Sequence, residues 1–98
     1  MVKLLSLAVV TVALLAPISG ASNCTPGLRY CGYVLLRVGN YKEQIIQALR
    51  AEGQDFDWRA INTSYFDCLG GSNGDIKWLS NCRTCVDNGY GNSDTCLT

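Results

Sequence analysis

The sequence predicts a small α+β domain, in which one helix packs on a three- to four-stranded, mainly antiparallel sheet in the order β-α-β-β. Residues 40–53 have the apolar spacing of an amphipathic helix, and segments of strand composition lie on both sides of it. Six cysteines fall within the chain that remains, about 77 residues long, if residues 1–21 are a signal peptide. Helix and sheet each have one apolar face, which predicts that they pack as a two-layer sandwich.

The first strand is expected at residues 30–38 (YCGYVLLRV), because aromatic and β-branched residues dominate this run and Gly39 ends it. The helix follows, with Asn40 as its N-cap, Glu43 at the N3 position of a capping box and Gly53 as its stop. One stripe of the helix is apolar, and the residues at helical spacing along it are Tyr41, Ile45, Ala48, Leu49 and Glu52, with Ile46 beside them.

Residues 54–62 are polar apart from Phe56 and Trp58, and they predict a loop that folds back onto the core. Two strands are then expected at residues 64–69 (SYFDCL) and 75–82 (DIKWLSNC). The glycine-rich segment between them predicts a β-hairpin turn. The chain from Val86 onward is rich in turn-forming residues, with at most one more short strand, and we expect its last cysteine to hold it down.

Residues 1–21 have the composition of a signal peptide that is removed before residue 22. One positive charge precedes an apolar run at residues 4–15, Pro17 ends that run, and small residues precede the cut. An apolar run of roughly 12 residues is too short for a membrane span, which takes about 20. We therefore expect residues 22–98 to be a single secreted, extracellular domain.

The cysteines favour three disulfides, because oxidation is the default outside the cell. A zinc site is disfavoured, since the chain has no histidine and only one C-x2-C pair. That pair encloses Arg83 and Thr84 and lacks the flanking residues of thioredoxin-like redox motifs. The six positions are Cys24, Cys31, Cys68, Cys82, Cys85 and Cys96.

Spacing alone does not choose among the possible disulfide pairings. If Cys82 and Cys85 lie on one strand, their offset of three points them to opposite faces, so we expect them to have different partners. We prefer a bridge between Cys31 and Cys68, which leaves the first and last cysteines to take one each of the close pair.

Charge and residue types restrict the chemistry of the chain. Eight Lys and Arg balance eight Asp and Glu, so nothing predicts nucleic acid or an anionic membrane as partner. Without histidine the usual general base is missing. A glycosidase pair needs a cleft with its carboxyls about 5 to 9 Å apart, for which the chain is small. We assign no catalytic, cofactor or metal residue and interpret these carboxylates as solvated charges: Glu43, Glu52, Asp55, Asp57, Asp67 and Asp75.

Binding is left as the mode of action, and exposed aromatic residues are its best candidates. Trp58 and Tyr90 lie in expected loops, and together with Arg59 they form the candidate binding surface, suited to a protein or to a stacked sugar. The alternative for Trp58 is that it plugs the open end of the sheet. Trp78 shares a strand face with Ile76 and is expected in the core.

Two N-glycosylation sequons occur, Asn23-Cys24-Thr25 and Asn62-Thr63-Ser64. Asn62 lies in an expected loop and is the stronger acceptor. At Asn23 the middle residue is a cysteine that can enter a disulfide before the glycan is transferred.

Three segments carry a resemblance to known proteins: residues 24–32 (CTPGLRYCG) with Leu35 and Leu36, residues 70–76 (GGSNGDI) and residues 93–96 (SDTC). They resemble small secreted cysteine-rich proteins of ascomycete fungi, many of them candidate effectors of plant pathogens. The resemblance implies a virulence factor that acts in the apoplast or after delivery into host cells. We expect the mature protein to be a monomer whose partner is a host plant protein. The expected element order is also similar to that of the α/β-sandwich killer toxins of smut fungi, although the cysteine spacing differs.

Three functions therefore follow from the sequence. The first is a secreted effector that binds a host protein. The second is an antimicrobial or killer-type toxin, which the balanced charge disfavours. The third is a carbohydrate-binding or enzyme-inhibitor module of the apoplast.

Overall fold

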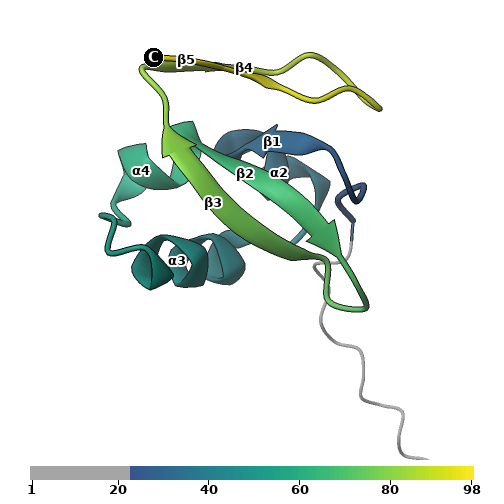
Figure 1. The fold of residues 1–98 in the computed structure, drawn as a ribbon, viewed down its shortest axis with the longest axis horizontal. Helices are drawn as coiled ribbons and strands as arrows, with labels where there is room; N and C mark the ends of the chain where they lie inside the picture. The colour runs from purple at the N-terminus through teal and green to yellow at the C-terminus, as the bar shows by residue number, and fades with distance from the viewer. Residues whose placement is uncertain (1–22) are drawn as a thin grey trace, which may run out of the picture.

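The structure is a computed structural model and describes residues 23–98, so the signal peptide expected at residues 1–21 lies outside the described residues. The α+β class and the antiparallel pairing are confirmed (Figure 1). Three helices, where one was expected, separate the first strand of the described chain from four later strands. The elements are β1 (Arg29–Cys31), α2 (Gly32–Val38), α3 (Lys42–Ala51), α4 (Trp58–Thr63), β2 (Ser64–Gly70), β3 (Asp75–Asn81), β4 (Thr84–Val86) and β5 (Thr95–Leu97).

A three-stranded antiparallel sheet in the order β1-β2-β3 forms the centre of the fold. The hairpin expected from the second and third strands is confirmed, and its turn contains Gly71 and Gly74, both with positive φ. On β2, Phe66 and Cys68 are buried. This face of the sheet turns towards the helices.

The second half of the expected first strand is helix α2 instead. In the antiparallel register Cys31 lies opposite Tyr65, and β2 begins only one residue earlier, so a longer β1 would run past the end of its partner. Gly32 also lies so close to α4 that a Cβ atom there would be 1.7 Å from the carbonyl oxygen of Ile61. Because no strand is available to satisfy the backbone of this apolar run, the run forms its hydrogen bonds internally as a helix.

Helix α3 is the predicted amphipathic helix, and its end is where we expected it. Its N-cap is Tyr41 rather than Asn40, and no side chain caps it. Gly53 has a φ of +68°, and the amide after it donates to the carbonyl of Leu49 at 2.9 Å, as in a Schellman motif. The stop is therefore confirmed, whereas the capping box is not.

Tyr41 takes the N-cap position because its side chain is anchored in the core, where it is fully buried. Its hydroxyl donates to the carbonyl of Gly74 at 3.0 Å and accepts from the amide of Cys24 at 3.3 Å. Burial raises the pKa of this hydroxyl. One side chain thus joins α3, the turn between β2 and β3, and the start of the described chain.

Helix α4 occupies part of the loop expected at residues 54–62. Asp57 is its N-cap, and Oδ1 of that carboxylate accepts from the amide of Ala60 at 2.9 Å. The buried side chain of Ile61 holds the helix on the core. A helix this short has too few turns to produce an apolar stripe, so its periodicity does not reveal it.

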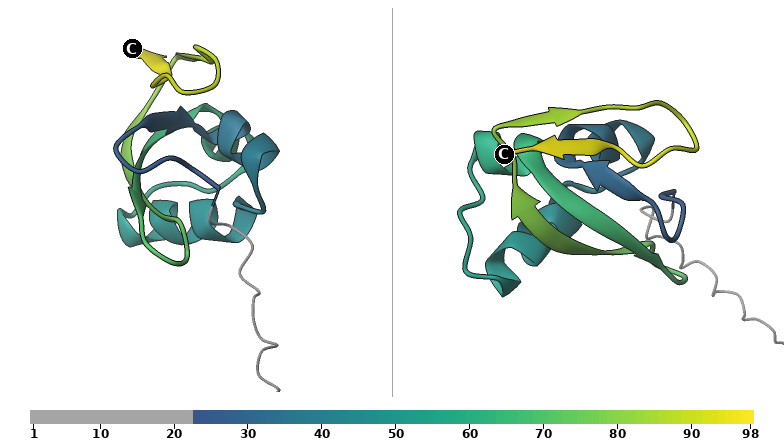
Figure 2. Two further views of the ribbon diagram at one scale, coloured as in Figure 1. Left: turned by 90° about the vertical axis from the view of Figure 1, so that its right-hand side faces the viewer. Right: turned by 45° about the horizontal axis from the view of Figure 1, so that its top comes forward.

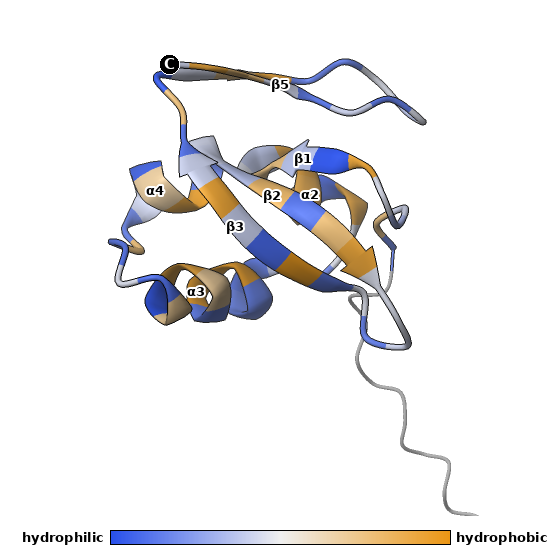
Figure 3. Ribbon diagram, in the orientation of Figure 1, coloured by the Kyte–Doolittle hydropathy of each residue, from blue (hydrophilic) through white to orange (hydrophobic). Residues whose placement is uncertain are grey.

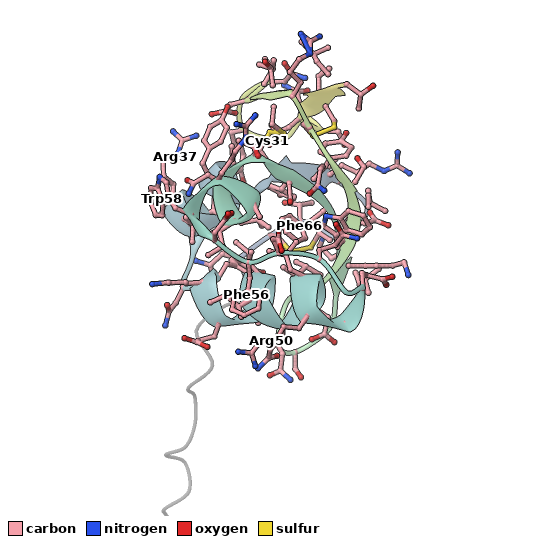
Figure 4. All side chains as sticks on the ribbon, turned by 90° about the vertical axis from the view of Figure 1, so that its left-hand side faces the viewer. Cys31, Arg37, Arg50, Phe56, Trp58 and Phe66 are labelled. Atoms are coloured by element: carbon pink, nitrogen blue, oxygen red, sulfur yellow. A yellow bond between two sulfur atoms is a disulfide. The ribbon has the colours of Figure 1, made fainter. Side chains whose placement is uncertain are left out.

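Two aromatic residues lie differently from our expectation. Phe56 does not fold back onto the core but is 43% exposed, with the guanidinium carbon of Arg50 lying 4.7 Å from the centre of its ring (Figure 4). Trp78 packs against the core but is only partly buried. Its indole Nε1 is buried without a hydrogen-bond partner among residues 23–98.

The apolar core lies between the three-stranded sheet and the helices. Helix α3 packs against β3, α2 packs against β1 and β2, and α4 packs against α2. Figure 3 shows apolar residues in all three helices and in the hairpin of β2 and β3, whereas the loop between β4 and β5 is hydrophilic or neutral. The largest fully buried side chains are those of Leu35, Tyr41, Ile45, Leu49 and Phe66.

Strands β4 and β5 form a second, two-stranded antiparallel sheet near the C-terminus. This hairpin was expected to be turn-rich from Val86 onward, with at most one short strand. Residues 87–94 are indeed an extended loop, but a strand flanks it on each side and Cys85 lies opposite Cys96. The hairpin lies above the rest of the molecule in Figure 1, and the left view of Figure 2 also shows it apart from the central sheet.

All six cysteines form disulfides, and none of them is free. Cys82 and Cys85 have different partners, as expected, and the last cysteine pairs with one of them. One bridge lies within the C-terminal hairpin, one joins this hairpin to β1, and one joins the start of the described chain to β2. The three bridges are Cys24–Cys68, Cys31–Cys85 and Cys82–Cys96.

The preferred bridge between Cys31 and Cys68 is wrong. Cys31 lies opposite Tyr65 in the sheet register, three residues away from Cys68 along β2. The segment before β1 lies beside Cys68 instead, because the amide of Cys68 donates to the carbonyl of Leu28 at 2.9 Å. This contact brings Cys24 within reach of Cys68 and leaves Cys31 to the C-terminal hairpin.

Candidate functional site

The loop at residues 87–94 is braced at its base by the buried side chain of Asp94, which is 4% exposed. The carboxylate accepts hydrogen bonds from the amide of Cys31 at 2.9 Å and from the amide of Asn88 at 3.0 Å. The hydroxyl of Tyr65 donates to the carbonyl oxygen of Asp94 at 2.6 Å. One residue thereby connects both ends of the loop to β1 and β2.

Tyr90 lies at the tip of this loop, between two glycines. Gly89 and Gly91 have φ angles of +93° and +83°, which glycine adopts without strain. The amide of Asn92 donates to the carbonyl of Gly89 at 3.2 Å and closes the turn. Tyr90 is fully exposed, at 101% of its reference area, as expected from the sequence.

A groove of about 410 Å³ lies between this loop, helix α2 and the start of the described chain. Tyr30, Val34 and Val38 supply its apolar lining, and the loop supplies its outer wall. The hydroxyl of Tyr30 accepts from the amide of Thr25 at 2.8 Å, which fixes one side of the groove. Asn23 stands at the rim and donates to the carbonyl of Val38 at 2.5 Å. The volume lies within the range of small-ligand pockets.

An ion pair beside the groove joins α2 to the loop. The guanidinium of Arg37 donates to the carboxylate of Asp87, and its carbon lies 5.7 Å from the centre of the Tyr33 ring. The amide of Gly89 and then the guanidinium of Arg37 lower the pKa of Asp87. The hydroxyl of Tyr33 donates to the carbonyl of Cys85 at 2.9 Å. The side chains of Arg37 and Tyr33, both on α2, therefore hold the C-terminal hairpin in place.

The surface predicted from Trp58, Arg59 and Tyr90 is divided between two parts of the molecule. Trp58 and Arg59 begin α4, whereas Tyr90 lies on the loop at the opposite end of the C-terminal hairpin (Figure 1). Trp58 is 72% exposed, so it does not plug the sheet, and it projects from the same side of the molecule as Arg37 (Figure 4). Arg59 lines a separate hollow of about 360 Å³ with Asp55.

The two sequons lie in different surroundings. Asn62 is on α4 rather than in a loop, is half-buried, and donates from Nδ2 to the carbonyl oxygen of Trp58 at 2.8 Å. Ser64 of the same sequon is fully buried, and its hydroxyl donates to Oδ1 of Asn81 at 3.0 Å. Asn23 is exposed at the groove.

Several acidic side chains of residues 23–98 make structural contacts. Asp57 caps α4, Asp94 braces the loop, and a carboxylate oxygen of Glu52 lies 4.0 Å from Nζ of Lys77. Among these residues no group of three or more His, Cys, Asp or Glu side chains gathers where it could hold a metal ion. No helix in the described part of the chain is both long enough and apolar enough to cross a membrane.

Sequence reasoning identified Tyr90 but missed the two contacts that position its loop. Asp94 was not singled out, because a lone carboxylate before a cysteine has no periodic or motif signal. Arg37 was placed on a strand, so its contact with Asp87 was not foreseen. The only available signal was the pair of acidic residues that flank the glycine-rich loop.

Comparison with known proteins adds no relative. No family model, no curated protein and no solved structure matches the chain.

Proposed function

We propose that this protein is a secreted, effector-like module that acts without catalysis, by binding a host protein through the groove and the exposed ring of Tyr90. Residues 1–21, with the composition of a signal peptide, support secretion. The three disulfides are compatible with an oxidising, extracellular location. The fungal origin and the host plant as the site of action follow from the resemblance of the chain to secreted ascomycete proteins.

The observation that carries this proposal is the presentation of Tyr90. A fully exposed tyrosine is offered to solvent on a loop whose base is braced by the buried carboxylate of Asp94. Tyrosine is enriched in the energetic centres of protein interfaces, because its large ring has few rotatable bonds to immobilise. A loop that is already ordered loses less conformational entropy when it binds, so the bracing favours affinity.

The groove beside the loop suits an apolar side chain of the partner. Tyr30, Val34 and Val38 offer apolar contact area, and the ion pair of Arg37 with Asp87 borders the opening. An interface of this kind has an apolar centre and a polar rim, as specific protein interfaces do. Tyr90 would lie across the partner residue that enters the groove.

The test compares two exposed aromatic residues at separate ends of the molecule. Tagged mature protein and its Tyr90→Ala and Trp58→Ala variants are incubated with plant apoplastic fluid and leaf extract, and the retained proteins are quantified. We expect one plant protein to bind the wild type and Trp58→Ala equally, and Tyr90→Ala at least about 30-fold more weakly. Both rings are exposed, so neither substitution disturbs the core.

Equal retention of every plant protein by all three forms would remove the groove and Tyr90 as the binding site. A parallel column of insoluble chitin separates the carbohydrate-binding alternative. Retention on chitin that is lost in Trp58→Ala would favour that alternative over a protein partner.

A further inference from the structure

Trp58 presents a large apolar surface to solvent, since 72% of its residue area is exposed in the described part of the chain. The ring lies outside the groove and projects into solvent (Figure 4). A complete N-glycosylation sequon begins four residues later, at Asn62. Positions four apart on a helix lie on the same face, so the exposed ring and the acceptor amide are neighbours on α4.

The acceptor atom itself points towards Trp58. Nδ2 of Asn62, the atom to which an N-linked glycan is attached, lies 2.8 Å from the carbonyl oxygen of Trp58. Side chains on a helix tilt towards its N-terminus and cover the preceding turn. A sugar on Asn62 therefore leaves the helix in the direction of the turn that carries Trp58.

We propose that Asn62 carries an N-linked glycan and that the first N-acetylglucosamine of this glycan packs on the indole of Trp58. The ring carbons of the sugar present an apolar face, and the indole is the largest aromatic surface available to it. The glycan would then cover Trp58 in the mature protein and leave Tyr90 as the uncovered aromatic anchor. The inference rests on the secretion that the proposed function includes, but not on the identity of the partner.

The transfer reaction is the standard one for N-linked glycans and takes its sugar from a lipid-pyrophosphate-linked oligosaccharide. The amide nitrogen of Asn62 attacks the anomeric carbon of the donor, and the bond from that carbon to the pyrophosphate oxygen breaks. The lipid pyrophosphate leaves, and the amide loses one of its two protons. The modified amide retains one N–H, and we expect it to keep the contact with the carbonyl of Trp58, which is 2.8 Å long in the unmodified side chain.

The structure also sets the order of events. The hydroxyl of Ser64, which completes the sequon, is fully buried and bonded to Asn81 in the folded chain. Transfer therefore precedes the pairing of β2 with β3. Asn23 is the poorer acceptor, because Cys24, the middle residue of its sequon, can enter its bridge to Cys68 before the glycan is transferred.

The experiment uses the full chain, including its leader, secreted from a eukaryotic host. Intact mass and peptide mapping locate the glycan in the wild type, Asn62→Gln and Asn23→Gln. An endoglycosidase then trims the glycan to a single N-acetylglucosamine, and an amidase removes it completely. We expect the glycan on the wild type and on Asn23→Gln but not on Asn62→Gln.

Contact with the sugar is measured in a Trp78→Phe background, in which Trp58 is the only tryptophan. We expect a neutral quencher such as acrylamide to quench Trp58 about twofold more weakly when a single N-acetylglucosamine is present than after its removal. Removal should lower Tm by an amount on the order of 4 °C in the wild type and by much less in Trp58→Ala. The Trp58→Ala form controls for effects of the glycan that do not involve the ring.

A secreted protein without a glycan at Asn62 would overturn the inference. So would equal quenching of Trp58 with and without the sugar, or an equal loss of Tm in the Trp58→Ala form. None of these three results affects the proposed function, which fails only if binding of the plant protein does not depend on Tyr90.

Discussion

The body of the molecule, residues 24–81, and the C-terminal hairpin, residues 82–98, are held in place by different forces. In the body, large apolar side chains fill the space between the helices and the three-stranded sheet. In the hairpin the buried residues are Cys82, Cys85 and Asp94, and the side chains of Val86 and Leu97 are substantially exposed. A two-stranded hairpin is at best marginally stable alone, so its order depends on disulfides and on specific hydrogen bonds to the body.

This difference explains where the candidate site lies. A segment that is held by disulfides and a few hydrogen bonds does not need apolar residues of its own, so its loop can carry the glycines and the exposed Tyr90 of the proposed binding site. The groove runs along the boundary between the two regions, with α2 on one side and the loop at residues 87–94 on the other. Its shape therefore depends on both kinds of force.

The largest expected effect comes from cutting the covalent link between the two regions. In Cys31→Ala/Cys85→Ala, the simple chain-entropy description gives a loss of about 4 kcal/mol in the free energy of unfolding. We expect the hairpin to lose order first, because the bridge is its main attachment to β1. Amide hydrogen exchange would show fast exchange at residues 84–97 while α3 stays protected.

The matched control for this variant is Cys24→Ala/Cys68→Ala. The two bridges span 54 and 44 residues of sequence, so their entropic contributions are nearly equal. The control should lose similar global stability but keep the hairpin protected from exchange. If amide exchange in the hairpin becomes equally fast in both variants, the Cys31–Cys85 bridge is not what holds the hairpin, and the proposed difference between the two regions is wrong.

The next largest effect is expected at a buried apolar residue of α2, the helix that borders the groove. Leu35 on α2 is fully buried, and Leu35→Ala should lower the free energy of unfolding by about 3 kcal/mol through lost burial and a residual cavity. Because α2 carries the apolar lining of the groove, binding should weaken along with stability. Chemical denaturation followed by circular dichroism measures the stability, and titration with the proposed plant partner measures the binding.

Leu36→Ala on the same helix is the control, since this side chain is only partly buried. Leu36→Ala should lower the free energy of unfolding clearly less than Leu35→Ala does. Equal losses would mean that α2 is not anchored by its buried face.

The sequence predicted those parts of this fold in which local chemistry decides. Gly53 as the stop of α3 and the glycine-rich turn after β2 follow from backbone conformations that favour glycine. The nature of residues 32–38 did not follow, because YVLLRV suits a buried strand or a buried helix equally well. The choice is made by β2, because it begins at Ser64, opposite the end of β1, and offers residues 33–38 no strand to pair with.

The full disulfide pairing and most of the candidate site also could not be predicted from the sequence, because both depend on contacts between residues that are far apart in the chain. The bridge from Cys24 to Cys68 depends on a backbone contact between Leu28 and Cys68, residues forty positions apart. The bracing role of Asp94 likewise depends on amides that only the folded chain brings near it. Tyr90 was accessible to sequence reasoning because a tyrosine between two glycines is a local feature.

A smaller effect is expected at the single side chain that joins three segments of the body. Tyr41→Phe keeps the ring but removes the hydroxyl, which leaves the carbonyl of Gly74 and the amide of Cys24 without this partner. We expect a loss of about 1 to 2 kcal/mol in the free energy of unfolding, with the fold retained. Thermal unfolding near neutral pH measures it, and an unchanged Tm would show that the hydroxyl contributes nothing to stability.

The same variant should change the response of the protein to alkali. Burial raises the pKa of Tyr41 above its ordinary value of 10.0, so the folded state keeps a proton that the unfolded state releases. The stability that this difference contributes is complete below pH 10 and is lost as the pH rises towards the folded pKa. Tyr41→Phe removes this loss, which denaturation at pH 9 and above would detect as a flatter pH profile.

The smallest effect concerns the ion pair that joins the two regions beside the groove. The pKa of Asp87 lies below its ordinary value of 3.8, first because of the Gly89 amide and second because of Arg37. The folded state therefore releases this proton more readily than the unfolded state does. The contribution of Asp87 is present above its unfolded pKa and is lost as the pH falls through the folded pKa.

We expect Arg37→Gln to return the pKa of Asp87 only part of the way to its ordinary value, because the Gly89 amide is the larger cause and remains. Carboxyl carbon chemical shifts recorded by NMR between pH 2 and 6 measure this pKa, and amide exchange at residues 87–94 reports whether the loop loosens. Because the pair is exposed, the loop rather than the body should respond. A pKa that returns fully to its ordinary value would assign the whole shift to Arg37, and the loop would then be held by charge from α2 rather than by its own turn.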